Sequence, residues 1–341
     1  MGNTDEKIAV GKKTETKVKD VGNHATSSSQ GSIDDIPQSA SDNISRAMII
    51  DAIREYYDNK NDTTLRKCRI WIAKRLEQQT VAFMGVIEKF HVVYLLQDRM
   101  LVPSDADAIY RTLKNRQEKD LQKPVLLILD SGGGRIEPAY LIGKMLREGT
   151  GLEVAVPRRA KSAATLICCA ASHIHMGSLS ELGPIDPQIN GVPALGLKNA
   201  IQHLAELTGK YPDAVNLFVG YMCKRVEPLA LGYYERVVES SMQYAERLLA
   251  QAFPREPIQN RKAIARKLTY DYKDHGFVID KQEASDVFPA QSIKVDTDEY
   301  LFSDMIYKEV EFVKCIASMY GFDFSVVGTG SAAINFNENH K

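Results

Sequence analysis

The sequence lacks the features of a secreted, membrane-spanning or nucleic-acid-binding protein. Its N-terminus has no apolar run after the charged residues, and no later segment approaches about 18 consecutive apolar residues. The 43 basic and 44 acidic side chains nearly cancel, to a formal net charge of −1. This balance gives no electrostatic reason to expect nucleic acid or a membrane surface as a partner. We expect a cytoplasmic protein whose partners are small molecules or peptides.

The sequence also gives little support for disulfides or a metal site. Its five cysteines are an odd number, and none forms a Cys-x-x-Cys pair. Cys168 and Cys169 fall in an apolar helical stretch, where we expect small hydrophobic core side chains, with a redox switch as the alternative. We therefore expect no metal and no cofactor.

The N-terminal part of the chain divides into two regions. Residues 1–43 are polar and contain almost no large apolar side chain, which predicts a disordered tail. Residues 44–90 predict a helical N-terminal region, with a first helix over 44–57 capped by Ser41 or Asp42. We expect a structural or oligomeric role for this region.

From about His91 the pattern changes to short β-rich runs that alternate with amphipathic helices. Unbroken apolar strands, each followed by a helix, predict a parallel sheet covered on both faces, which is an α/β fold. The expected strands are 91–96, 125–129, 152–156 and 173–176, and the expected helices between them are 104–116, 137–148 and 162–171.

After Pro187 the sequence becomes mostly helical. The expected helices are 196–209, 213–224, 229–253, 260–270 and 298–319. The main domain is expected to cover residues 91–285. Residues 286–341 are expected to form a C-terminal helix and a flexible polar tail that begins near Phe322.

A glycine-rich loop follows the buried strand that ends near Leu129. The run Gly132-Gly-Gly134 lets the backbone approach a ligand closely and present amide N–H groups to a phosphate or a developing oxyanion. The loop lacks the third spaced glycine of a dinucleotide-binding motif and the Gly-Lys-Ser/Thr of a P-loop. Alone, it does not decide between these ligands.

Ser162 lies at a second junction between a strand and a helix, in the run Pro157-Arg-Arg-Ala-Lys-Ser-Ala-Ala-Thr165. An N-cap serine is the structural interpretation. The functional one is a nucleophile whose oxyanion is bound by the unpaired N–H of Ala163. Both junctions lie at the carboxyl ends of parallel strands, where open α/β sheets place their sites. Together they predict an acyl-transfer site.

Three motifs in this order resemble the serine dehydrogenase proteinase family, which is related to signal peptide peptidase A and the Clp proteolytic subunit. They are the glycine loop Leu129-Asp-Ser-Gly-Gly-Gly134, the run at Ser162, and His175-Met-Gly-Ser-Leu-Ser-Glu-Leu-Gly-Pro-Ile-Asp-Pro-Gln188, of which the part from Glu181 is the most similar. The resemblance covers roughly residues 90–285. It implies a Clp protease/crotonase-like ββα superhelix with helical additions at both ends, ATP-independent peptidase activity on peptides or proteins, and homo-oligomers.

Matching these motifs residue by residue gives Ser162 as the nucleophile. Ala163 supplies one oxyanion amide, and Gly133 or Gly134 supplies the other. Gly132 stands where related loops have proline. Asp186 is expected to flank the substrate and to orient a base, with a solvent-facing turn as the alternative.

The sequence offers several candidates for the general base. Lys224 is preferred because its apolar neighbours Tyr221, Met222 and Val226 would desolvate the amine. Lys210, His175 and His275 are second-line candidates. Each lysine has a solvated surface charge as its alternative role, and each histidine a packing role.

Lys161 is a poor candidate for the base, because neighbours in sequence do not face each other on a helix. We expect Lys161 to help place the loop.

Three functions follow from these residues. The first is a serine peptidase that forms an acyl-enzyme on Ser162. The second is a non-peptidase crotonase-like enzyme, in which the same amides would bind a thioester enolate and Ser162 would be dispensable. The third is a catalytically silent oligomeric scaffold.

Overall fold

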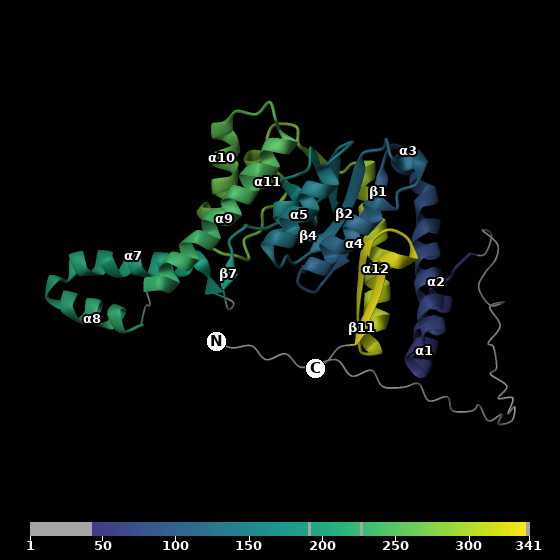
Figure 1. Cartoon of the computed structure of the whole chain (residues 1–341), viewed down its shortest axis with the longest axis horizontal. Helices are drawn as coiled ribbons and strands as arrows, with labels where there is room; N and C mark the ends of the chain where they lie inside the picture. The colour runs from purple at the N-terminus through teal and green to yellow at the C-terminus, as the bar shows by residue number, and fades with distance from the viewer. Residues whose placement is uncertain (1–42, 190–191, 226–227, 339–341) are drawn as a thin grey trace, which may run out of the picture. The chain divides into compact units, whose positions relative to one another are not determined.

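A nine-stranded mixed sheet lies at the centre of the part of the chain that the structure, a computed structural model, describes: residues 43–189, 192–225 and 228–338 (Figure 1). The order along the sheet is β11-β10-β1-β2-β3-β5-β9, in which β10 is Phe322–Gly328 and β11 is Ile334–Glu338. Its parallel strands are β1 (His91–Gln97), β2 (Val125–Ser131), β3 (Leu152–Val156), β5 (His173–Met176) and β9 (Ile293–Val295).

Two short strands extend the sheet beside β2. β4 (Arg159–Ala160) pairs in parallel with β2 and with β6 (Glu181–Leu182). A separate antiparallel hairpin joins β7 (Gln188–Ile189) to β8 (Val192–Pro193). The α/β class predicted from alternating apolar strands and helices is confirmed.

Helices cover both faces of the sheet, which is why β2 is buried along its whole length. One core contains α4 (Pro103–Lys114), α5 (Ile136–Arg147), α6 (Ala163–Cys168), α9 (Pro228–Ala252), α10 (Ile258–Arg266) and α11 (Lys281–Val287). The other contains α1 (Arg46–Asn59), α2 (Asp62–Thr80), α3 (Met84–Lys89) and α12 (Asp298–Met319) (Figure 1).

Cys168 and Cys169 lie fully buried in the first of these cores. Burial raises the pKa of the Cys169 thiol to about 12, so that the thiol stays protonated at neutral pH. The prediction that these residues are core side chains is confirmed.

The N-terminal helices form close to their predicted positions and pack on α12. Ser45 caps α1 by accepting a hydrogen bond from Met48 N at 3.2 Å, so the cap lies further along the chain than predicted. Buried Glu309 of α12 pairs with Arg46 of α1 and Arg75 of α2, both at 3.1 Å. The tail expected at the N-terminus falls on residues 1–42, outside the described residues.

The sequence predicts a flexible C-terminal tail from Phe322, and the structure corrects this prediction. Residues from Phe322 form β10 (Phe322–Gly328), antiparallel to β1, and β11 (Ile334–Glu338), antiparallel to β10. Phe322, Phe324 and Phe336 are buried against α1 and α2. The apolar residues stand at alternate positions between polar ones, and this alternation explains why the segment forms strands.

The helices expected after Pro187 are α7 (Ala194–Lys210), η4 (Pro212–Ala214), α8 (Val215–Arg225), α9 and α10, followed by a π-helical turn, η5 (Lys267–Asp271). None of the helices in the described ranges combines the length and the apolar character that crossing a membrane requires.

The core beneath α12 gives a stability prediction. Phe302 is fully buried, with its ring centroid 5.6 Å from that of Phe83. Replacing Phe302 with Ala should lower the free energy of unfolding by about 3–5 kcal/mol, because it leaves a cavity. Its neighbour Leu301 is 48% exposed, so Leu301→Ala is the matched control and should cost about 0.5 kcal/mol or less. Chemical denaturation measures both, and equal losses would contradict the packing.

Candidate active site

The glycine loop after β2 is built so that only glycine fits at its last two positions. Gly133 has φ +96° and Gly134 φ +149°, a region that side chains rarely adopt. Leu101 N donates to Gly133 O at 2.8 Å, and Arg135 N donates to Leu101 O at 2.9 Å. A Cβ on Gly134 would lie 2.2 Å from Leu101 N. The loop is therefore held against the backbone that follows β1.

Ser162 occupies a strained turn between β4 and α6. Its φ is +52° and its ψ −119°, and its side chain makes no capping hydrogen bond. The N-cap interpretation therefore does not describe what this hydroxyl does. A non-glycine residue in such a conformation costs about 1–3 kcal/mol and is typical of functional sites.

The two junctions meet because Ser131 at the end of β2 pairs with Ala160 of β4. A Cβ built on Gly133 would lie 2.6 Å from Lys161 O, 2.9 Å from Ser162 Cβ and 3.1 Å from Ala163 N. The glycine loop and the serine turn are thus in direct backbone contact. This contact is the geometry that an oxyanion site next to a nucleophile requires.

The amide N–H groups of this contact differ in their partners. Gly133 N donates to Ser131 Oγ at 3.1 Å. Neither Gly134 N nor Ala163 N has a hydrogen-bond acceptor within the described part of the chain. The N–H groups of Ala163 and Gly134 are therefore donors without an acceptor in the described part of the chain, whereas that of Gly133 is already bonded.

His275, which lines a cleft together with Ser162, forms a hydrogen-bonded pair with Asp186. His275 Nδ1 donates to Asp186 Oδ1, and the Asp186 side chain is 9% exposed. This hydrogen bond and the charge of Asp186 raise the pKa of His275, against a smaller opposing effect of burial. The pair leaves Nε2 of His275 as the ring nitrogen able to accept a proton.

A cleft of about 430 Å³ brings these groups together. No hydrogen bond joins His275 to Ser162 among the described residues, but such bonds often form only when substrate is bound. The residues that line the cleft are Asp98, Arg99, Met100, Gly132, Gly133, Gly134, Arg135, Ile136, Ser162, Ile185, Pro187, Gln188, Val237 and His275.

The structure does not bring the lysine candidates to this cleft. Lys224 lies on α8 and Lys210 at the end of α7, and both side chains are exposed. Neither is among the described residues that line the cleft. The Lys224 side chain is exposed, so it lacks the desolvation expected from its sequence.

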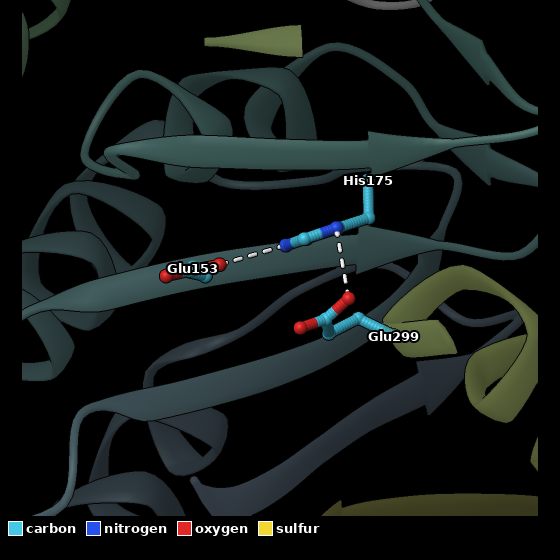
Figure 2. Close-up of side chains that lie close together, drawn as sticks. All are labelled: Glu153, His175 and Glu299. Carbon is cyan, nitrogen blue, oxygen red and sulfur yellow. Dashed lines mark hydrogen bonds and ion pairs between the residues drawn. The ribbon is translucent and has the colours of Figure 1, made fainter. Parts of the chain in front are cut away.

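His175 lies on the face of β5 that packs against α12, away from the residues that line the cleft. Its Nε2 is 2.8 Å from Glu153 Oε2 and its Nδ1 is 2.8 Å from Thr297 Oγ1. Figure 2 shows His175 between Glu153 of β3 and Glu299 of α12. The second-line candidate His275 therefore lines the cleft with Ser162, and His175 is not among the described residues that line it.

Glu153, His175 and Glu299 are the described residues whose ligand atoms are close enough to hold a metal, all within 4.8 Å of one another. Both carboxylates already have cationic or hydrogen-bonding partners. Lys89 lies 3.1 Å from Glu299, and His173 lies 3.4 Å from Glu153. The Lys89 ammonium would repel a metal ion, so the cluster is better described as a set of polar contacts that join α12 to the sheet.

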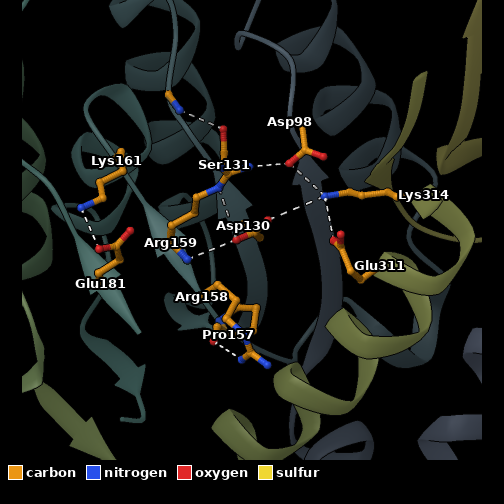
Figure 3. A network of polar contacts seen from close by, with 11 residues as sticks. Asp98, Asp130, Ser131, Pro157, Arg158, Arg159, Lys161, Glu181, Glu311 and Lys314 are labelled. Atoms are coloured by element: carbon orange, nitrogen blue, oxygen red, sulfur yellow. Dashed lines mark hydrogen bonds and ion pairs between the residues drawn. The ribbon is translucent and has the colours of Figure 1, made fainter. Parts of the chain in front are cut away.

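A polar network that the sequence analysis missed supports the rim of the cleft (Figure 3). Lys314 of α12 is 7% exposed and lies 3.2 Å from Asp98 and 3.8 Å from Asp130. Arg159 N donates to Asp130 Oδ1 at 3.1 Å. Burial raises the pKa of Asp130, although Lys314 opposes this. Nothing in the local sequence of Lys314 indicates these partners.

Comparison with known proteins gives one family match. Residues 49–213 match the sequence model of the ClpP-like SDH-type serine proteinases. The matched span contains Ser162, the glycine loop and Asp186, and it ends before Lys224 and His275. The α/β sheet agrees with a ClpP-like fold.

Two uncharacterized proteins of Methanocaldococcus jannaschii are similar to parts of the chain. MJ0137 is 29% identical over 152 residues, which is 44% of this chain and 46% of that protein. MJ1495 is 26% identical over 208 residues, 60% of this chain and 61% of that protein. The match covers less than two thirds of the length of either relative.

Gly133 and Gly132 provide a matched test of the contact at Ser162. Gly133→Ala should slow the labelling of Ser162 by a fluorophosphonate by about 10²-fold, because its Cβ would displace the Lys161–Ser162 backbone. A Cβ on Gly132 meets nothing within 4 Å, so Gly132→Ala should label at nearly the wild-type rate. Similar rates for both variants would contradict the close approach.

Proposed function

We propose that the protein is a serine peptidase that cleaves peptide bonds through an acyl-enzyme on Ser162, because residues 49–213 match the sequence model of the ClpP-like SDH-type serine proteinases. One observation carries the proposal. Ser162, in a strained turn, lines a single cleft with Gly133, Gly134 and a histidine that is bonded to a buried carboxylate.

The proposed reaction begins when His275 Nε2 takes the proton of Ser162 Oγ as the oxygen attacks the scissile carbonyl carbon. Asp186 holds Nδ1–H and stabilises the imidazolium. The N–H groups of Ala163 and of Gly134 or Gly133 donate to the oxyanion. His275 then protonates the leaving amine, and a water molecule hydrolyses the ester by the same steps.

His275 is preferred to Lys224 as the base on two grounds. His275 lines the cleft with Ser162, and its Asp186 partner orients the ring, whereas the Lys224 side chain is exposed on α8.

The two other functions make different demands on the same residues. A crotonase-like thioester enzyme would use the amides but has no need of a strained serine or of the His275–Asp186 pair. A silent scaffold needs neither the strained serine nor the His275–Asp186 pair. ATP-independent cleavage of peptides or proteins, self-association and a cytoplasmic location are further parts of the proposal.

Ser162→Ala is the direct test. Fluorophosphonate should label wild-type Ser162, and Ser162→Ala should lose both the label and about 10⁴-fold or more in peptidase rate. Turnover of an acyl-CoA that survives Ser162→Ala would favour the thioester enzyme. Absence of label from folded wild-type protein would count against any acyl-enzyme.

The identity of the base is tested by a pair of variants. His275→Ala should lower kcat/KM by about 10⁴-fold or more, because no other side chain takes the serine proton. Lys224→Ala should leave kcat/KM within about twofold of wild type, since its amine lies in solvent. The reverse pattern would assign the base to Lys224. Peptide hydrolysis, measured with variants of equal thermal stability, decides between them.

The raised pKa of His275 predicts the pH profile. His275 must be neutral to accept a proton, so kcat/KM should fall as the pH drops through a pKa above the usual value of about 6.5. In Asp186→Asn the hydrogen bond to the carboxylate and its charge are lost, so the acid limb should move to lower pH while the maximum rate falls. Asp274→Asn, which removes a weaker charge effect on His275, is the control and should move the limb less. An unmoved limb in Asp186→Asn would contradict the pairing.

A further inference from the structure

Lys161 precedes the nucleophile in sequence but points away from it. Its side chain is 17% exposed, and its ammonium is surrounded by oxygen atoms. Nζ lies 3.0 Å from Glu181 Oε2 and donates to Leu182 O and Phe277 O, both at 3.3 Å. Figure 3 shows Lys161 directed toward Glu181 of β6.

We propose that Lys161 is the positioning residue that fixes Ser162 relative to His275 and Asp186. The proposal rests on the peptidase function argued above and adds to it how the three reacting groups are kept in register. Lys161 acts through the segments that it joins and does not exchange a proton with substrate.

The carbonyls bound by Lys161 belong to the two segments that carry the acid and the base. Leu182 lies shortly before Asp186, and Phe277 lies just after His275. These segments also pair with each other, because Leu182 N donates to Ile279 O at 2.8 Å and Ile279 N donates to Leu182 O at 3.0 Å. Lys161 therefore connects the serine turn to an acid–base unit that is already paired.

The backbone of Lys161 completes the connection to the oxyanion loop. Its N–H donates to Ser131 O at 3.1 Å, and its carbonyl oxygen would lie 2.6 Å from a Cβ on Gly133. One residue thus contacts the glycine loop, the segment before Asp186 and the segment after His275, and it is joined covalently to Ser162. A reacting group displaced by about 1 Å can lose about 10²-fold in rate, so these contacts bear directly on catalysis.

Gly183 provides the space that Lys161 needs. A Cβ on Gly183 would lie 2.5 Å from Lys161 Cδ, in the flexible part of the side chain. Gly183→Ala should therefore push the lysine side chain aside without a clash against backbone. This variant perturbs the same contact while keeping the lysine.

The same contacts exclude Lys161 from the role of base. An ammonium has three N–H donors and no lone pair, and three oxygen acceptors lie around this one. A base in this position would have to give up these bonds and turn toward Ser162. Lysine is needed here because its long stem and three donors reach two carbonyls and a carboxylate at once.

The test compares Lys161→Met, Lys161→Arg and Gly183→Ala. Lys67→Met is the control, because Lys67 is similarly shielded and pairs with Glu55 at 2.8 Å on the other face of the sheet. Lys161→Met should lower kcat and the fluorophosphonate labelling rate of Ser162 by about 10²-fold with KM nearly unchanged. Lys161→Arg should recover most of this loss, and Gly183→Ala should lose about tenfold. Lys67→Met should label like wild type.

The pH profile separates positioning from proton transfer. In Lys161→Met the acid limb should stay at the wild-type pH, because His275 and Asp186 remain paired. Wild-type labelling in Lys161→Met would overturn the proposal. So would a loss of about 10⁴-fold that arginine does not rescue, since that size of loss marks a base.

Amide hydrogen exchange gives a readout that needs no activity. Exchange at Leu182 and Ile279 should be faster in Lys161→Met than in Lys67→Met and wild type, because the ammonium no longer supports their pairing through its bonds to Leu182 O and Phe277 O. Unchanged exchange would overturn the positioning role even if the protein were inactive. Failure of wild-type Ser162 to label would instead overturn the peptidase function, so the two failures are distinguishable.

Discussion

The contact between Gly133 and the Lys161–Ser162 backbone is the constraint on which the candidate site depends. It exists because β2 and β4 are parallel and paired at Ser131 and Ala160, so that the chain leaves both strands at the same edge. The absent Cβ of Gly133 lets the loop approach the turn closely enough to place amide N–H groups beside the serine. The strain at Ser162 is the conformational cost of directing its hydroxyl into the cleft instead of onto the helix N-terminus.

The α/β class and this contact could be predicted because their signals are local. Unbroken apolar strands, glycines after one of them and a serine before a run of small residues lie within short stretches of sequence. The His275–Asp186 pair could not be predicted in the same way, since its members are 89 residues apart. Both residues were identified as candidates, but only the fold shows that they meet. Lys224 was preferred as the base because of its apolar neighbours in sequence. The side chain is nevertheless exposed, because apolar neighbours along a helix do not by themselves bury a lysine.

Two further features depended on tertiary contacts. Residues from Phe322 appeared polar and flexible, yet the phenylalanines at alternate positions pair as strands against β1 and pack beneath α1 and α2. Lys314 lies in an amphipathic helix like many surface lysines, but its ammonium reaches Asp98 and Asp130 beside the cleft. In both cases the deciding partner is far away in sequence, so local periodicity carries no information about it.

The pairing of Leu182 with Ile279 has a consequence for how this protein could diversify. All the helices from α7 to α10 lie between the two residues of this pair, so they form an excursion whose ends are closed by backbone hydrogen bonds. Closing a longer loop costs only slowly increasing entropy. Since α9 and α10 supply buried core residues such as Leu248 and Ala265, the α7–α8 part of this excursion is the part that can be lengthened, shortened or replaced in evolution while Asp186 and His275 stay paired. The residues of this part could then change in evolution without changing the residues of the candidate site.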